Sequence, residues 1–126
     1  MDISFTGREL DVMAVLWQRG SGTVAEVRDA LNDDLAYTTV LTVLRTLEEK
    51  GYVTHTAEGK AHRYVPAVTQ RAAGGSALSR VLDKIFDGST ELLLTQLVSD
   101  RKLDPDELRR LRNLLDERLT VRKKRS

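Results

Sequence analysis

Apolar side chains recur every three or four residues in three stretches of the first half of the chain, 6–20, 23–31 and 37–51. This spacing places them on one face of an α-helix and leaves polar residues on the other face. The first two stretches open with Thr6 and Thr23, each followed three residues later by a glutamate, which is the capping-box pattern of a helix start. The third stretch ends at a glycine, a residue that commonly terminates helices. The pattern therefore predicts three short helices.

The pattern of side chains changes directly after the third stretch. Two strand-like runs, 52–56 and 61–65, flank a turn signal at 58–60, and Pro66 ends the second run. These runs predict a β-hairpin. Three helices followed at once by a hairpin indicate a winged helix, a module whose usual function is to read DNA.

Beyond the hairpin the strand signals disappear and leucine-rich helical spacing returns. We expect a fourth helix within 69–87, more secure over 76–87 because the paired glycines at 74–75 weaken its first part. A short apolar helix is expected around 92–98. An acidic cap followed by proline at 104–105 predicts the start of a final helix that frays over the last residues of the chain.

The sequence therefore predicts a mainly α protein, with an N-terminal winged helix-turn-helix domain at 1–67 and a C-terminal helical dimerisation domain with a short basic tail at 68–126. About fifty residues in three short helices cannot bury so many leucines by themselves, so we expect a second copy of the chain to cover them. The alternative is a monomer in which these helices fold back onto the first half. The apolar residues assigned to the dimer interface are Leu78, Leu82, Ile85, Phe86, Leu93, Leu97, Leu111 and Leu115.

Composition narrows the range of functions. The chain has 126 residues and no cysteine, which excludes disulfides and thiolate metal sites. It has no apolar run long enough to cross a membrane and no signal-peptide pattern at its start, so we expect a cytoplasmic protein without membrane insertion. Net charge is +1, but residues 1–66 carry 7 Lys/Arg against 10 Asp/Glu. Bulk charge therefore gives no support to a nucleic-acid partner, and any support must come from where the cations lie.

The outward face of the third helix carries the candidate chemistry, with hydroxyls and a guanidinium three or four residues apart. Threonine hydroxyls bond phosphates or base edges, their methyl groups contact the thymine methyl, and arginine donates to guanine or phosphate. Free N–H groups at the start of this helix also favour a phosphate. The alternative is a solvated surface on which Thr38 is merely the N-cap. The predicted DNA-binding residues of this helix are Thr38, Thr39, Thr42, Arg45 and Thr46.

The hairpin supplies a second cluster of candidate side chains, Lys60, His62 and Arg63, at or just after its turn. In a winged helix this turn meets the DNA backbone, although a solvated hairpin tip has a similar composition. His55 and His62 could face one another across the hairpin, but two imidazoles without a third ligand make a poor metal site. We predict no metal and no cofactor. The sequence has no thiol nucleophile and no glycine-rich phosphate loop, so we do not expect an enzyme.

Several motifs, in this order and spacing, resemble the penicillinase-repressor family, which includes the methicillin-resistance regulators. They are ELDVMAVLW at 9–17, TVAEV at 23–27, YTTVLTVLRTL at 37–47, GYV at 51–53 and GKAHRY at 59–64. The resemblance implies a homodimeric winged-helix repressor that binds a palindromic operator in double-stranded DNA and commonly controls its own operon. It places the threonines and Arg45 on the DNA-reading helix, and residues from about 69 onward in the dimerisation region.

The resemblance also bears on how repression ends. In antibiotic-responsive members, a sensor-protease system triggers cleavage at an Asn-Phe bond in the helix that follows the Gly-Ser break. The matching position here is Gln96-Leu97, which departs from that pattern. Copper-responsive relatives carry paired cysteines near the C-terminus, and this chain has none.

Two other functions remain open from the residues. One is a winged-helix protein-interaction module that does not read DNA, which the acidic balance of residues 1–66 favours. The other is a regulator with a small-molecule pocket between its two halves, although no buried polar cluster in the sequence indicates one.

Overall fold

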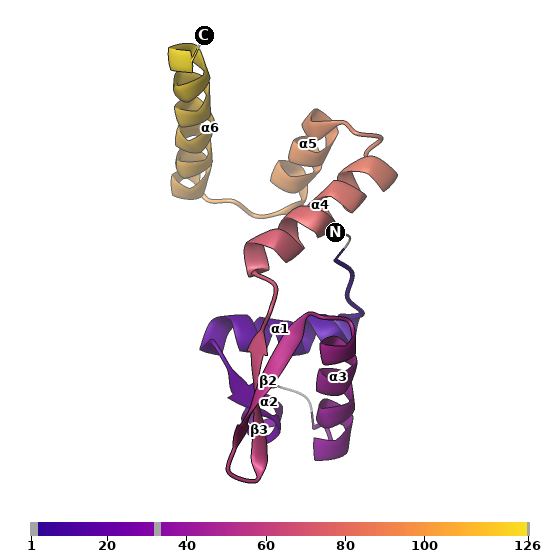
Figure 1. Ribbon diagram of the computed structural model, residues 1–126. Helices are drawn as coiled ribbons and strands as arrows, with labels where there is room; N and C mark the ends of the chain where they lie inside the picture. The colour runs from indigo at the N-terminus through magenta and orange to yellow at the C-terminus, as the bar shows by residue number, and fades with distance from the viewer. Residues whose placement is uncertain (1–2, 32–33, 126) are drawn as a thin grey trace. The chain divides into compact units, whose positions relative to one another are not determined.

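The computed structural model describes residues 3–31 and 34–125, which form two compact units divided within one helix, between Arg80 and Val81. The first unit contains the predicted helices and hairpin, and the second is helical (Figure 1). The elements are α1 (Gly7–Arg19), β1 (Gly22–Thr23), α2 (Val24–Ala30), α3 (Tyr37–Glu49), β2 (Val53–Glu58), β3 (Ala61–Pro66), α4 (Gln70–Lys84), α5 (Thr90–Asp100) and α6 (Pro105–Arg125). The predicted fold class, mainly α with a winged helix, is confirmed.

Both capping boxes form as the sequence predicted. At the start of α1, the Thr6 hydroxyl accepts a hydrogen bond from the Glu9 N–H at 3.2 Å, and the Glu9 carboxylate accepts one from the Thr6 N–H at 2.8 Å. Thr23 and Glu26 repeat this exchange at the start of α2, at 3.2 and 3.0 Å. Two otherwise unpaired N–H groups are thereby satisfied at each helix start.

The wing is part of a three-stranded antiparallel sheet in the order β1-β3-β2. The sequence predicted the β2–β3 hairpin but missed β1, which has two residues and pairs Gly22 with Tyr64 and Thr23 with Arg63. Gly22 is buried, and a Cβ there would lie 3.0 Å from the Val27 side chain. Any larger residue would therefore press on the Val27 side chain where β1 passes close to α2.

One core holds the first unit together. It is formed by the inward faces of α1, α2 and α3 against the sheet, and Tyr64 from β3 is its largest fully buried side chain. Trp17 packs at the edge of this core, where its indole N–H donates to the Val68 carbonyl at 2.9 Å. The fully buried side chains are Val12, Met13, Leu16, Val27, Val40, Leu44, Leu47, Val53 and Tyr64.

The third helix begins at Tyr37, two residues earlier than an N-cap at Thr38 would require. Its N-cap is Ala36, which makes no side-chain capping bond, so the interpretation of Thr38 as the N-cap is wrong. The helix ends at Glu49, and Gly51 takes a positive φ of 84° that permits the turn into β2.

The fourth helix differs from the prediction at both ends. It begins at Gln70 and runs through the paired glycines because the Thr69 hydroxyl accepts from the Ala72 N–H at 3.0 Å and Ala73 is buried in the core. It ends at Lys84 because Asp87 and Gly88 both adopt positive φ, 55° and 77°.

The start of α4 is tied to the N-terminal segment. The Ser76 hydroxyl bonds the Ile3 backbone at 3.2 Å, and the Arg80 guanidinium donates to the Ile3 carbonyl at 2.7 Å. The compact first unit therefore extends to Arg80. The boundary at residue 67 was predicted between a DNA-binding and a dimerisation domain, and it stays a prediction.

The second unit contains the end of α4 together with α5 and α6. The Ser89 hydroxyl accepts from the Leu92 N–H at 3.2 Å to start α5, and the Asp104 carboxylate accepts from the Glu107 N–H at 2.8 Å to start α6. The predicted fraying is wrong, since α6 continues to Arg125. Within the part of the chain that the structure describes, no helix combines the length and the apolar character needed to span a bilayer.

Candidate nucleic-acid interface

The outward side of α3 is a polar surface presented by a firmly packed helix. Val40, Leu44 and Leu47 are at most 1% exposed and fix the inward side. The five residues predicted from the sequence share the opposite side and form the reading face: Thr38, Thr39, Thr42, Arg45 and Thr46. All are exposed except Thr46, which is half-buried. The structure therefore brings the predicted helix residues together on one surface.

The hydroxyls of the reading face do not all behave alike. The Thr42 hydroxyl donates to the Thr38 carbonyl at 2.9 Å, and the Thr46 hydroxyl donates to the Thr42 carbonyl at 3.0 Å. Among the described residues, Arg45 has no hydrogen bond or salt bridge, and neither does the side chain of Thr39. The Arg45 guanidinium thus keeps its donors free for an external acceptor.

The start of α3 carries an exposed tyrosine that was not among the predicted DNA-binding residues. Tyr37 is 44% exposed at the first helical position, directly before the reading face. An exposed aromatic at the start of a predicted recognition helix was the available signal. Since Ala36 provides no side-chain cap, the first N–H groups of α3 also lack that partner and favour an anion.

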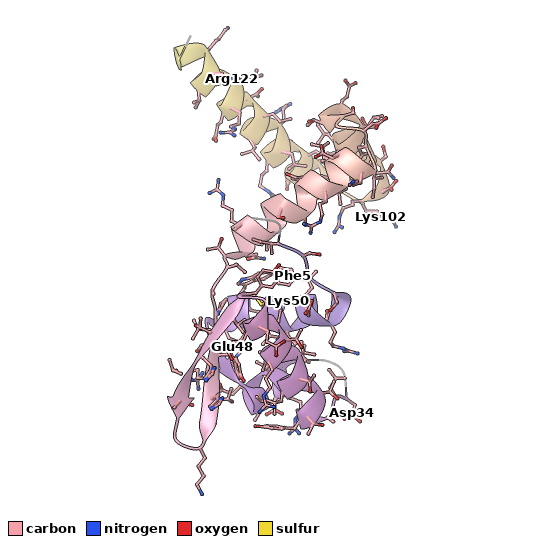
Figure 2. All side chains as sticks on the ribbon, turned by 45° about the vertical axis from the view of Figure 1, so that its right-hand side comes forward. Phe5, Asp34, Glu48, Lys50, Lys102 and Arg122 are labelled. Carbon is pink, nitrogen blue, oxygen red and sulfur yellow. The ribbon has the colours of Figure 1, made fainter. Side chains whose placement is uncertain are left out.

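The β2–β3 turn and the start of α3 lie toward the same end of the first unit (Figures 1 and 2). Asp34, just before α3, marks this end in Figure 2, while Lys50 marks the other end of the helix. Lys60 is exposed at the turn, without a hydrogen bond or salt bridge to the rest of the described chain. A groove that received the start of α3 would therefore have the turn beside it.

The two histidines lie close together, as expected. Their rings stack at a centroid distance of 4.2 Å, and the Nδ1 atom of His55 lies 2.6 Å from the Glu48 carboxylate of α3. This contact joins the hairpin to α3. No group of three or more metal-binding side chains occurs within the residues that the structure describes.

Burial, together with the nearby Glu48 carboxylate, raises the pKa of Tyr64 beneath the histidines.

Arg63 is engaged within the chain. Its guanidinium forms a two-point bond with Glu58 at 2.9 and 2.9 Å, lies 3.0 Å from the Glu26 carboxylate, and donates to the Ser21 hydroxyl at 3.1 Å. A hydrogen bond from the Thr23 N–H, followed by one from Arg63, lowers the pKa of Glu26, and Arg63 likewise lowers the pKa of Glu58. The DNA contact of Arg63 stays a prediction. The bonds to Glu58 and Glu26 show that Arg63 also links the hairpin to α2.

Glu9 connects α1 with the far end of α3. Its buried carboxylate accepts hydrogen bonds from the Lys50 ammonium at 2.8 and 3.0 Å. Burial on its own would raise the pKa of Glu9, but the Lys50 and Thr6 bonds outweigh it, so the pKa lies below its usual range.

Several acidic residues of the first unit have partners within it. Glu9, Glu26, Glu48 and Glu58 all have cationic or histidine partners within the first unit. The same contacts also occupy Lys50 and Arg63, so the net charge of residues 1–66 is unchanged. On the reading face itself, Arg45 has no salt bridge to any described residue.

The residues assigned to the dimer interface leave apolar surface uncovered in the single chain. Leu78, Ile85, Leu97 and Leu115 are 47–70% exposed. The remaining four are half-buried: Leu82, Phe86, Leu93 and Leu111. Gln96 and Leu97, the position matching the family's cleavage site, are exposed in the middle of α5. The dimer and the cleavage site stay predictions.

The chain is similar to known transcriptional regulators in both sequence and structure. The Transcriptional regulator BlaI of Mycobacterium tuberculosis is 36% identical over 113 residues, covering 86% of this chain and 80% of that protein. The Penicillinase repressor of Bacillus licheniformis is 25% identical, over 86% of this chain and 87% of its own length. The solution structure of the DNA binding domain of the repressor BlaI matches with a TM-score of 0.51 and 29% identity, covering 56% of this chain and 88% of that domain. The Penicillinase repressor family model matches residues 5–117, and the chain belongs to this family.

Proposed function

We propose that the chain is a homodimeric transcriptional repressor that binds a palindromic operator in double-stranded DNA. The α3 reading face enters the major groove and reads bases. Lys60 and His62 at the wing, together with the uncapped start of α3, contact phosphates. The observation that carries the proposal is the reading face, where a free arginine and exposed threonines lie on a helix whose other side is fully buried. The likeness to the DNA binding domain of the repressor BlaI supports a DNA-binding role for the first unit.

The second unit supports the dimer. Exposed leucines on α4, α5 and α6 form apolar surface that a second copy of the chain would remove from water. A two-fold dimer presents two α3 helices to two half-sites about one helical turn apart, which explains why the operator would be palindromic. Bound in this way, the dimer would block transcription from an adjacent promoter.

We infer the biological setting from the name of one relative. One of them bears the name Penicillinase repressor, so we extend to this chain a role in an antibiotic-response operon, including control of its own gene. Release by a sensor-protease system would act at Gln96-Leu97, in the exposed middle of α5. The protein would work in the cytoplasm, where a DNA partner is available.

Removing the Arg45 guanidinium tests the proposed readout. We expect Arg45→Ala to weaken binding to a duplex from upstream of the chain's own gene by about tenfold or more, because a two-point contact to guanine is lost. Fluorescence anisotropy with the labelled duplex measures the affinity. The control is Arg71→Ala, which removes an exposed arginine of α4 outside the reading face. Unchanged affinity of Arg45→Ala would contradict the readout.

The protein-interaction module remains a candidate because residues 1–66 carry more acid than base. The dependence of affinity on salt separates the two functions. DNA binding displaces counterions, so affinity for the upstream duplex falls steeply as salt rises. A chain that used α3 for a protein partner would bind every duplex weakly.

A further inference from the structure

We infer that Thr42 and Thr46 read hydrogen-bond donors on base edges, so that the groups they meet are the amino groups of adenine or cytosine. The inference rests on the proposed function and names the base chemistry that the reading face selects. It concerns specificity, whereas the proposed function concerns binding.

The direction of the hydrogen bonds within α3 carries the inference. A threonine hydroxyl has one hydrogen to donate and lone pairs with which to accept. Thr42 uses its hydrogen on the Thr38 carbonyl at 2.9 Å, and Thr46 uses its hydrogen on the Thr42 carbonyl at 3.0 Å. What each hydroxyl offers outward is a lone pair beside a methyl group. Donating to a base would require breaking the bond to the helix carbonyl, so accepting is favoured.

Base edges in the major groove differ in the same property. Adenine N6 and cytosine N4 donate, whereas guanine O6 and thymine O4 accept at the equivalent positions. Hydroxyls that only accept therefore favour adenine or cytosine over guanine or thymine. The adjacent methyl group suits a neighbouring thymine methyl.

Arg45 has the opposite chemistry on the same face. Its guanidinium only donates, and it has no hydrogen bond or salt bridge to any described residue. The reading face thus presents an acceptor at Thr42, a donor at Arg45 and an acceptor at Thr46. The sequence alone left both directions open, because threonine bonds either kind of edge.

The test exchanges donor and acceptor on the DNA while its shape is kept. The probe is the duplex that the wild-type chain selects from a randomised library. At each adenine·thymine pair of the half-site, hypoxanthine·5-methylcytosine replaces the pair, which swaps amino and oxo groups but keeps N7, the methyl group and the minor-groove edge. At each guanine·cytosine pair, the reference duplex carries guanine·5-methylcytosine. Replacing that pair with 2,6-diaminopurine·thymine swaps the amino and oxo groups in the same way.

The protein side of the test is Thr42→Val, which keeps the size of the side chain and removes its lone pairs. We expect wild type to lose about three- to tenfold in affinity at one pair on exchange, and Thr42→Val to show no loss at that pair. Thr46→Val repeats the comparison at a neighbouring pair. Thermal melting shows that each variant is folded.

Thr120→Val is the matched control. Thr120 is exposed on α6, and its hydroxyl donates to the Asp116 carbonyl at 3.0 Å, so the same internal bond is removed away from α3. Its base profile should equal that of wild type. The inference is overturned if Thr42→Val keeps the wild-type loss at every pair, or if the pair that depends on Thr42 favours an oxo group. A library that yields no preferred sequence would overturn the proposed function as well.

Discussion

Glu9 caps α1 and at the same time binds Lys50, the C-cap residue of α3. The spacing from Thr6 predicted the capping role, because a capping box is a local pattern. Nothing local predicted the Lys50 contact, since the two residues are 41 positions apart and meet only in the folded chain. On α3, too, the sequence predicted one feature and missed another. Periodicity predicted which side chains share the reading face, but it did not predict that Thr42 and Thr46 donate to their own helix.

The Glu9–Lys50 contact makes stability depend on pH. The pKa of Glu9 in the folded chain lies below the ordinary value of 4.5, so its stabilising effect is complete above that value and is lost as pH falls through the folded pKa. We expect Glu9→Gln to lower the free energy of unfolding at neutral pH by about 1–3 kcal/mol. The difference from wild type should shrink below about pH 4.5. Urea unfolding followed by tryptophan fluorescence measures it.

A matched variant isolates the role of Lys50. With Lys50→Met, burial acts on Glu9 without its main counterweight, so its pKa rises and the acid loss of stability begins at higher pH. A difference between wild type and Glu9→Gln that stayed the same down to acid pH would contradict this assignment.

At the scale of the elements, capping signals and hydrophobic periodicity predicted α1, α2, α3, α6 and the hairpin. The elements that were missed or misplaced depend on contacts between distant segments. The strand β1 has two residues and exists because β3 pairs with it. The helix α4 runs through two glycines because Ala73 packs in the core and Ser76 bonds Ile3. Propensity alone favoured a later start.

The wing raises a question that the sequence could not settle, whether Arg63 contacts DNA or holds the hairpin in place. Its bonds to Glu58 of β2 and Glu26 of α2 join the wing to the helix-turn-helix. We expect Arg63→Met to reduce affinity for the operator without changing how affinity depends on salt. Lys60→Ala should instead reduce the slope of log affinity against log salt by about 0.9, the effect of one lost phosphate contact.

Anisotropy titrations of both variants over a series of salt concentrations measure these slopes. Arg63→Lys, which keeps the charge but not the two-point geometry, is the control for charge. If Arg63→Met reduced the slope as much as Lys60→Ala does, Arg63 would be a phosphate contact, as its sequence position first suggested.

At the scale of the whole molecule, the composition of the second half predicted helices with more apolar surface than they can bury. The structure agrees in that Ile85 and Leu119 are 70% and 67% exposed. The sequence could not predict which leucines meet, because an interface between copies is set by surfaces and not by local spacing. The motifs that resemble the penicillinase-repressor family predicted the family correctly, which no single periodic pattern could do.

Titration of a labelled duplex from upstream of the chain's own gene, beside a scrambled duplex of equal length, tests the DNA-binding proposal most directly. We expect tight binding to the upstream duplex, a stoichiometry of two chains per duplex, and a steep loss of affinity as salt rises. Equal and weak binding to both duplexes would contradict a repressor of its own operon and would favour a protein partner for α3.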